Sequence, residues 1–371
     1  ILAIGLVGFW ALFLNLWKPK KKWPAWVGYI IIIGAWFAAI RYYILNQVDL
    51  YGTMYYPLMN MFRTESYGFL FGVFLAIPVF IILSLLYWTI NKIWSKTPEE
   101  NRTGRRAFFR TAATIVPLAT IGGSSYAAFA GQQELVVTHE SFGYTNLPPG
   151  LKNYKIVQLS DIHIGPSIDL DDFDEILKLA LLQKPNRVVI TGDLIDKLAW
   201  LPQVCERLTT FAKQIPDGVD FILGNHEYHH DVNKVLDSLK RNTPMNILVN
   251  SNIQIMGGKQ PVYIAGVAYD NDREKEKREA MIDKALSGIP DYAFVILLAH
   301  HPEFFEESIE RKIPLTLSGH THGGQIVFMG MPLVPTGTPY TKGRYVEEQS
   351  VCYVNNGTGH WFPIRINCPR E

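Results

Sequence analysis

The sequence predicts an α/β domain preceded by a region of transmembrane helices. Residues 1–130 contain several apolar runs of roughly 20 residues, the length that crosses a bilayer. From Tyr154 onward, short β-branched and apolar runs alternate with segments of helical periodicity, and each run ends in polar residues and glycine. We therefore expect two regions, residues 1–130 and residues 131–371.

Four segments of the first region are predicted membrane spans. They are Ile1–Trp17, Trp26–Leu45, Phe69–Ile90 and, more weakly, Thr111–Ala130. The last is rich in small residues, and we expect Pro117 and the Gly122-Gly123 pair to break it. A single run of this kind also suits a buried core helix, but several in succession, flanked by Trp and Tyr, favour membrane insertion.

Charge divides the chain at the same place and sets an orientation. Residues 1–130 hold 12 of the 35 Lys and Arg but only 4 of the 34 Asp and Glu, so the remaining residues carry 23 basic against 30 acidic side chains. The basic residues punctuate apolar runs, which excludes a nucleic-acid-binding arm, and no nucleic-acid partner is expected. Ten of the 12 lie in Lys18–Lys22 and Lys92–Arg110. The positive-inside rule makes both segments cytoplasmic and the second region extracytoplasmic, at a bacterial cytoplasmic membrane.

A second signal agrees with export. The stretch "GRRAFFR", Gly104–Arg110, resembles the twin-arginine consensus, and Ala128-Phe129-Ala130 resembles a signal-peptidase site. Cleavage after Ala130 would release the second region. The alternative is a basic membrane flank that contains two adjacent arginines, and both interpretations place the second region outside.

The second region is predicted to hold five buried strands, in the runs "YKIVQLS", "RVVIT", "VDFIL", "FVILLA" and "PLTLS". Leu170–Gln183 and Gln203–Gln214 have helical spacing, and Asp272–Ser287 is a charged, exposed helix. Hairpins around Ile247–Tyr269 favour a mixed sheet or a two-sheet sandwich over a purely parallel sheet. Cys352 and Cys368 could form a disulfide outside the cell, but no cysteine has the spacing of a thiolate metal site.

Ligand-type residues follow all five predicted strands. They are Asp161 and His163, Asp193 and Asp196, Asn225 and His226, His300 and His301, and His320 and His322. Side chains beyond the carboxyl ends of strands converge at one edge of an α/β sheet. Asp, Asn and His without Cys favour Mn²⁺, Zn²⁺ or Fe²⁺ over a structural zinc site. In an extended backbone, Asp-x-His and His-x-His would each direct two side chains to the same side, and neighbouring glycines would leave room.

The order DIH, GDLID, GNHE, H, GHTH, between residue 154 and about residue 325, resembles the calcineurin-like metallophosphoesterase superfamily. The segments "GRRAFFR", "GHTHGGQ" and "GTGHWFPIRINCP" further resemble its exported or membrane-anchored, YkuE-like branch. The resemblance implies a sandwich of two mixed β-sheets flanked by helices. It also implies a metal-dependent phosphoric ester hydrolase with two divalent ions.

The resemblance assigns roles to the ligand-type residues. One ion would be held by Asp161, His163, Asp193 and His322, and the other by Asn225, His300, His320 and the shared Asp193. His300 is preferred to His301 because the family's ligand stands two residues before the proline. The spacing of GHTH would suit ions about 3.5–4 Å apart. A hydroxide shared by the ions would attack phosphorus directly.

His226 would protonate the leaving oxygen, and Asp196 would orient its ring. The alternative for Asp196 is an N-cap of the segment that follows. Lys197 stands where protein Ser/Thr phosphatases of the superfamily carry arginine, which disfavours that activity.

The remaining candidates have weaker signals. His360 could reach the substrate or lie in a surface loop, and Arg365 could bind phosphate or form a salt bridge. His229 and His230 suit a solvated helix start.

These inferences predict a membrane-embedded enzyme that hydrolyses a phosphodiester, pyrophosphate or phosphomonoester, with a membrane lipid or lipid-linked phosphate as substrate. The alternatives are an exported phosphodiesterase for soluble substrates and a non-catalytic, metal-stabilised scaffold. The sequence does not indicate the oligomeric state.

Overall fold

The computed structural model describes residues 23–93, 99–133, 135–269, 274–333, 335–360 and 362–371. These residues divide into two compact units, one ending at Gln133 and the other running from Leu135 to the end of the chain. The sequence predicted a boundary close by, after residue 130. Each unit is described by itself.

The described residues of the first unit form three helices, α2 (Trp23–Gln47), α3 (Tyr56–Ile93) and α4 (Glu99–Gln133). Two glycines of α3 bring it close to α4, because a Cβ atom at Gly68 or Gly72 would lie 2.5 Å from the Cα atom of Ser125 or Ile121. Small residues spaced four apart allow helices to approach closely in this way. The predicted break at Pro117 and Gly122 is wrong, since α4 is continuous along its contact with α3.

Among the described residues, α3 is the one helix long and apolar enough to cross a membrane. Helix α2 contributes a shorter apolar segment, Ile33–Leu45. The predicted span Thr111–Ala130 lies within α4, which does not reach the apolar character of a span. The predicted span Ile1–Trp17 lies outside the described residues.

The second unit is built on two large β-sheets. The four-stranded sheet is parallel, in the order β1 (Ile156–Leu159), β2 (Arg187–Ile190), β3 (Val219–Phe221), β4 (Asn246–Ile247). The six-stranded sheet is mixed, in the order β11 (Gly343–Glu347), β12 (Ser350–Val354), β8 (Leu315–Ser318), β7 (Phe294–Leu298), β6 (Val262–Gly266), β5 (Ser251–Met256). Strands β9 (Val327–Phe328) and β10 (Met331–Pro332) form a separate pair.

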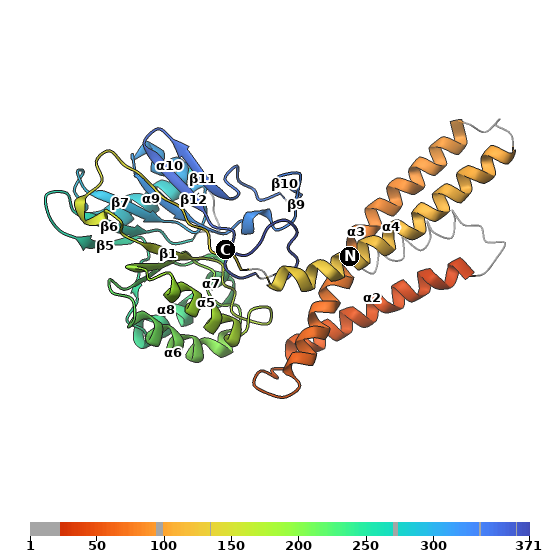
Figure 1. Ribbon diagram of the computed structural model, residues 1–371, viewed down its shortest axis with the longest axis horizontal. Coiled ribbons are helices and arrows are strands. Elements are labelled where there is room, and N and C mark those ends of the chain that lie inside the picture. Colours follow the sequence, from red (N-terminus) through yellow and green to blue (C-terminus); the bar gives the residue numbers. More distant parts are fainter. Residues whose placement is uncertain (1–22, 94–98, 134, 270–273, 334, 361) are drawn as a thin grey trace. The chain divides into compact units, whose positions relative to one another are not determined.

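The two sheets face each other across one apolar core, in which Val189 and Ile222 meet Ile264 and Leu298. Figure 1 shows α5 (Leu170–Leu182), α6 (Leu201–Ala212) and α8 (Val232–Asn242) beneath the four-stranded sheet. The outer face of the six-stranded sheet is covered by α9 (Lys275–Leu286) and α10 (Phe304–Glu310). The predicted sandwich of two sheets flanked by helices is confirmed, with the six-stranded sheet mixed and the four-stranded sheet parallel.

The five predicted strands and three predicted helices of this unit are all present, and the hairpin around Ile247–Tyr269 is β5 and β6. Helix α5 begins at a capping box, because the Asp169 carboxylate accepts from the N–H of Asp172. Cys205, Cys352 and Cys368 are free and buried, so the disulfide that the sequence allowed is not formed.

A buried ion pair joins β2 to β3. Arg187 Nη1 donates to Asp220 Oδ1 and Oδ2 at 2.9 and 2.8 Å, and Asn246 Nδ2 donates to Asp220 Oδ1 at 2.8 Å. We expect Asp220→Ala to lower the free energy of unfolding by about 3–5 kcal/mol, because it leaves a buried guanidinium without a counter-charge. Chemical unfolding of the full-length protein measures this loss.

The exposed pair between Arg311 and Asp283 provides the matched control. Asp283→Ala should cost less than about 1 kcal/mol, because water screens that pair. If both variants lost the same free energy of unfolding, burial would not be the reason why the Arg187–Asp220 pair stabilises the fold.

Candidate metal centre

The carboxyl ends of five strands deliver the ligand-type residues to one place. Asp161 follows β1 and Asp193 follows β2, while Asn225 opens the short helix α7 (Asn225–His230) after β3. His300 follows β7 and His320 follows β8, so both sheets contribute. The parallel direction of these strands is what places residues from distant parts of the chain together.

Five of these residues have left-handed backbone conformations. The φ angles are 53° at Asp161, 55° at His163, 52° at Asp193, 71° at His320 and 49° at His322. The prediction of an extended backbone through Asp-x-His and His-x-His is therefore wrong. Non-glycine residues in this region carry strain, and such residues cluster at functional sites because the surrounding fold holds them there.

Glycines leave the room that the carboxylates need. A Cβ atom at Gly224 would lie 2.2 Å from Asp193 Oδ1, and one at Gly319 would lie 2.3 Å from Asp161 Oδ2. Neither contact is tolerable, so both positions require glycine. This agrees with the role that the sequence predicted for glycines beside the ligands.

The first group of donors contains Asp161, His163 and His322, whose ligand atoms lie within 4.8 Å of one another. His163 Nε2 lies 3.1 Å from His322 Nε2, and His322 Nε2 lies 3.5 Å from Asp161 Oδ1. Asp193 Oδ2 lies 3.7 Å from His163 Nε2. Four predicted ligands of one ion thus converge.

The second group is centred on Asn225. Its Oδ1 lies 3.1 Å from His300 Nε2 and 2.9 Å from His320 Nδ1. The same Oδ2 of Asp193 lies 3.2 Å from His300 Nε2. Asp193 therefore stands between the two groups, in the place of the shared ligand that the sequence predicted.

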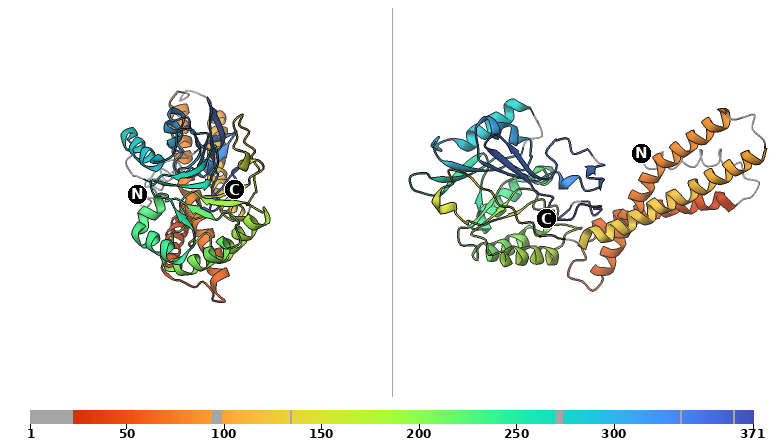
Figure 2. Two further views of the ribbon diagram at one scale, coloured as in Figure 1. Left: turned by 90° about the vertical axis from the view of Figure 1, so that its left-hand side faces the viewer. Right: turned by 45° about the horizontal axis from the view of Figure 1, so that its top comes forward.

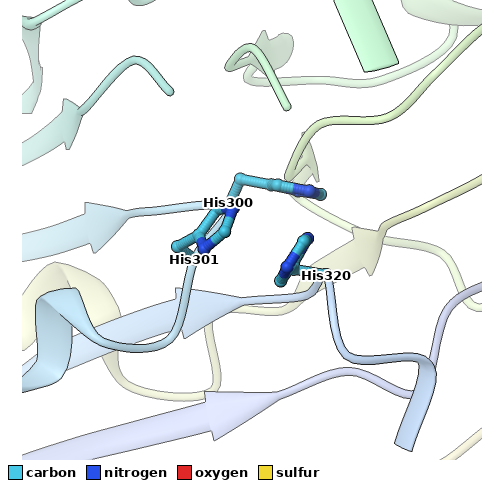
Figure 3. Close-up of side chains that lie close together, drawn as sticks. All are labelled: His300, His301 and His320. Atoms are coloured by element: carbon cyan, nitrogen blue, oxygen red, sulfur yellow. The ribbon is translucent and has the colours of Figure 1, made fainter. Parts of the chain in front are cut away.

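His300 and His301 have different surroundings. His300 Nδ1 donates to the carbonyl oxygen of Thr191 at 2.7 Å, and its Nε2 faces Asn225 Oδ1. The ring of His301 instead stacks on His320, with centroids 3.7 Å apart (Figure 3). This arrangement favours His300 as the ligand of the second ion, with His301 supporting the His320 ring.

The electrostatics of the site favour bound cations. Burial favours the neutral form of Asp193, but His300 and His163 outweigh burial and hold its pKa well below the usual value. Burial likewise lowers the pKa of His300, but Asp193 and Asp161 outweigh it and raise this pKa to about 10. The buried carboxylates thus attract positive charge strongly. Together with the amide and imidazole donors, they fit divalent ions of the Mn²⁺, Zn²⁺ and Fe²⁺ type.

His226 and Asp196 lie beside the first group, and both are partly exposed. Asp196 Oδ1 lies 2.7 Å from His226 Nδ1 and 3.2 Å from His163 Nδ1, so it orients both rings. The N-cap alternative for Asp196 is wrong, because the 3₁₀ helix η2 (Leu198–Trp200) begins after Lys197 and has no side-chain cap. Burial disfavours protonation of His226, but the hydrogen bond to Asp196 and the nearby carboxylates outweigh it and raise the pKa to about 9.

The sequence analysis assigned no role to Glu227. This fully buried carboxylate accepts from the N–H groups of Gly224 and Leu194 at 2.7 Å and of Asp193 at 3.0 Å. It therefore fixes the loop that carries Asp193 to the start of α7. The acidic residue directly after Asn-His in "GNHE" was the available signal.

His229 and His230 are exposed, as predicted, but they end α7 and do not start a helix. His230 nevertheless lies close to the site, since its Nε2 is 3.5 Å from Asp196 Oδ1. The ring of His229 lies 5.5 Å from the ring of His226, measured between centroids.

His360 and Arg365 lie in the interior, not at the surface. Arg365 Nη2 donates to the carbonyl oxygens of Gly359 and Asn356 and lies 3.0 Å from His322 Nδ1. It makes no salt bridge with any described residue. Burial, His163 and Arg365 keep the pKa of His322 well below the usual value, so the ring stays neutral as a metal ligand requires.

The prediction of a surface loop around His360 is wrong. The segment before it pairs with the loop after β1, where Thr358 N donates to Ser160 O at 2.7 Å and Gly359 N to Asp161 O at 3.0 Å. The His360 ring is therefore enclosed, and burial together with Arg365 and Arg370 holds its pKa well below the usual value. A fully enclosed ring offers no surface to a substrate that arrives from solvent.

Comparison with known proteins agrees with this site. Residues 154–324 match the calcineurin-like phosphoesterase family. The chain is also 30% identical over 349 residues to an uncharacterized metallophosphoesterase of Campylobacter jejuni, a match that covers 92% of this chain and 86% of that protein. The chain belongs to the calcineurin-like metallophosphoesterase family. It is accordingly a metal-dependent phosphoester hydrolase.

Two further members of the family are similar to this chain. The metallophosphoesterase YkuE of Bacillus subtilis is 30% identical over 262 residues, covering 66% of this chain and 86% of YkuE. A protein of Danio rerio, described as a transmembrane protein with a metallophosphoesterase domain, is 27% identical over 309 residues, covering 80% of this chain and 69% of that protein. The predicted superfamily is confirmed.

Proposed function

We propose that this metallophosphoesterase is embedded in a membrane and hydrolyses a phosphodiester, pyrophosphate or phosphomonoester of a lipid-linked substrate. It uses two divalent ions, Mn²⁺, Zn²⁺ or Fe²⁺, and His226 as general acid. The observation that carries the catalytic part is the position of Asp193. One oxygen of this carboxylate lies 3.2 Å from His300 and 3.7 Å from His163, and so joins the two groups of donors.

The two groups of donor residues would hold the ions that bind the substrate phosphate. When bound, the ions supply positive charge to the phosphate oxygens and make water nucleophilic near neutral pH. Asp161, Asp193, Asn225 and the histidines hold the ions, while Glu227 and Arg365 fix the loops that carry Asp193 and His322. The protein thus sets the positions of its donors before substrate arrives.

His226 would supply the proton for the leaving group. Asp196 accepts from Nδ1 at 2.7 Å, so the transferable proton is on Nε2. A pKa raised to about 9 keeps the ring protonated at neutral pH, and cations held nearby lower that pKa toward neutrality. A protonated, partly exposed imidazole beside the donors is what a leaving alkoxide requires.

The membrane part rests on α3, on the basic segment at its end, on the basic segment that precedes α2, and on relatives described as transmembrane proteins. We infer several spans in a bacterial cytoplasmic membrane, with the catalytic domain on the extracytoplasmic side. An enzyme held there meets lipid headgroups at high local concentration, which favours a lipid-linked substrate.

The test is hydrolysis by the purified full-length protein with Mn²⁺, Zn²⁺ or a chelator. Lipid phosphates and pyrophosphates in bilayers are compared with a soluble aryl phosphodiester and monoester. Metal-dependent turnover that is highest on a lipid supports the proposal. Turnover restricted to soluble esters, with cleavage after Ala130 in cells, identifies an exported phosphodiesterase instead. Bound metal without any turnover indicates a scaffold.

A further inference from the structure

An apolar hairpin follows the last metal ligand. It consists of β9, β10 and Leu333, residues 327–333, and begins shortly after the 3₁₀ turn His322–Gly324. Phe328 pairs with Met331, and the two residues between them have φ angles of 49° and 83°. Two left-handed residues make a type I′ turn, which fixes the strand register and the position of the tip.

The side chains of the apolar hairpin face solvent. The exposed fractions are 58% for Phe328, 83% for Met329, 65% for Met331 and 63% for Leu333. The sequence has no acidic or basic residue from Gly323 to Thr341, and the first one after it, Lys342, is exposed. Contiguous exposed apolar side chains of this size mark an interaction surface, whereas isolated ones do not.

The base of the hairpin is fixed to the metal centre. Val327 N donates to Ile366 O at 3.0 Å, and Leu333 N donates to Ile326 O at 2.8 Å. A Cβ atom at Gly324 would lie 2.4 Å from Pro332 Cβ, so the turn that contains His322 contacts the hairpin directly. The base of the hairpin is therefore held next to the turn that contains His322. Figure 1 and the right-hand view of Figure 2 show β9 and β10 standing away from the two sheets.

The chain also enters this unit beside the hairpin. Leu135, which comes shortly after the end of α4, bridges to Arg370, and Val136 N donates to Arg370 O at 2.9 Å. Arg370 belongs to the same terminal segment as Ile366, the residue that pairs with the hairpin base. Val136 and Ile366 are partly exposed and extend the apolar surface. The residues that follow α4 in the sequence therefore pair with the same terminal segment as the base of the apolar hairpin.

We propose that the apolar hairpin inserts into a lipid bilayer and holds the metal centre at the membrane surface. Phe328 and Met331 pair across the turn. The Phe, Met and Leu side chains suit the acyl boundary of a bilayer, and Lys342 suits anionic headgroups. The chain itself places the domain near a bilayer through α3. A lipid phosphate at headgroup depth would then lie beside His322. The proposed contact between hairpin and membrane does not depend on the proposed function, whereas its use in catalysis rests on that function.

Site-specific fluorescence tests the contact. All three native cysteines are buried, so Met329→Cys offers one accessible thiol to an NBD maleimide. The labelled full-length protein is reconstituted in phosphatidylcholine–phosphatidylglycerol vesicles with or without lipids that carry a nitroxide on the acyl chain. Val346→Cys, exposed on β11, is the matched control.

We expect nitroxide lipids to quench the label at 329 by about half and to leave the label at 346 nearly unchanged, because only the former reaches the acyl boundary. Equal responses at the two positions would overturn the proposal. The proposal would also be overturned if the fluorescence emission of the label at 329 were blue-shifted but not quenched by nitroxide lipids. That result would mean that a second copy or another segment of the chain covers the hairpin.

A catalytic measurement separates this inference from the proposed function. The double variant Met329→Asp/Met331→Asp should lower the ratio of lipid-phosphate turnover to soluble-ester turnover about tenfold, because two carboxylates oppose insertion. Val346→Asp should leave that ratio unchanged. Quenching at 329 without turnover of any lipid would contradict the proposed function alone. Lipid turnover with no quenching at 329 would contradict the hairpin proposal alone.

Discussion

Replacing His226 with alanine is expected to slow hydrolysis of alkyl phosphate esters by about 10²- to 10⁴-fold. An alkoxide is a poor leaving group and needs a proton as the bond to phosphorus breaks, and His226, held at 2.7 Å by Asp196, is placed to donate it. A nitrophenyl ester leaves without protonation, so its hydrolysis should fall much less. Measuring kcat for a series of esters with different leaving-group pKa values checks this difference.

The pH dependence gives an independent readout. The protonated form of His226 is the active acid, so activity on alkyl esters is retained below its pKa and lost as pH rises through it. Without bound cations that pKa is raised to about 9, and cations shift the loss to lower pH. His226→Ala should lack this alkaline limb, and Asp196→Asn should move it to lower pH. If His226→Ala lowered kcat equally on alkyl and aryl esters and left the loss of activity at high pH unchanged, His226 would be excluded as the general acid.

The sequence was most informative where a local pattern and a general rule of α/β folds act together. Buried runs such as "RVVIT" identified strands, and the rule that sites form at the carboxyl ends of strands then brought Asp161, Asp193 and His300 together across distant positions. The residue types alone indicated divalent metals. Identifying the candidate ligands therefore required no knowledge of side-chain conformation.

Backbone conformation at the ligands was not predictable in the same way. Asp161 and His320 have left-handed φ angles because neighbouring strands and loops hold them there, and no local preference indicates this. The role of Glu227 depends on three N–H groups from two separate loops. Burial of His360 depends on pairing with the loop after β1, which is nearly 200 residues away in the sequence.

Short elements and helix breaks were also decided by tertiary contacts. Strands β9 and β10 have two residues each, too few for a periodic pattern, and the exposed Met329 and Met331 look like an ordinary apolar run in the sequence. Helix α4 continues through Pro117 because α3 contacts it along one face, whereas local preference alone predicted a break.

Replacing Asp193 with alanine is expected to have the largest effect on the metal centre. The carboxylate lies within 3.7 Å of His163 and 3.2 Å of His300, so the variant removes a donor from both groups at once. We expect bound metal to fall from about two ions per chain to one or fewer, with a loss of turnover at least as large as that in His226→Ala. Metal analysis of the purified protein and kcat on an aryl ester measure the two effects.

Two variants separate loss of the donor from loss of the fold. Asp193 Oδ1 also accepts from His226 N at 2.8 Å, so alanine leaves that N–H without its partner, whereas Asp193→Asn keeps the acceptor and removes only the charge. Asp193→Asn should therefore retain the melting temperature of the wild type and still bind less metal. Asp196→Asn, which alters a neighbouring carboxylate outside the ligand set, should retain both ions. If Asp196→Asn lost an ion while Asp193→Asn kept two, the shared ligand would have to be reassigned.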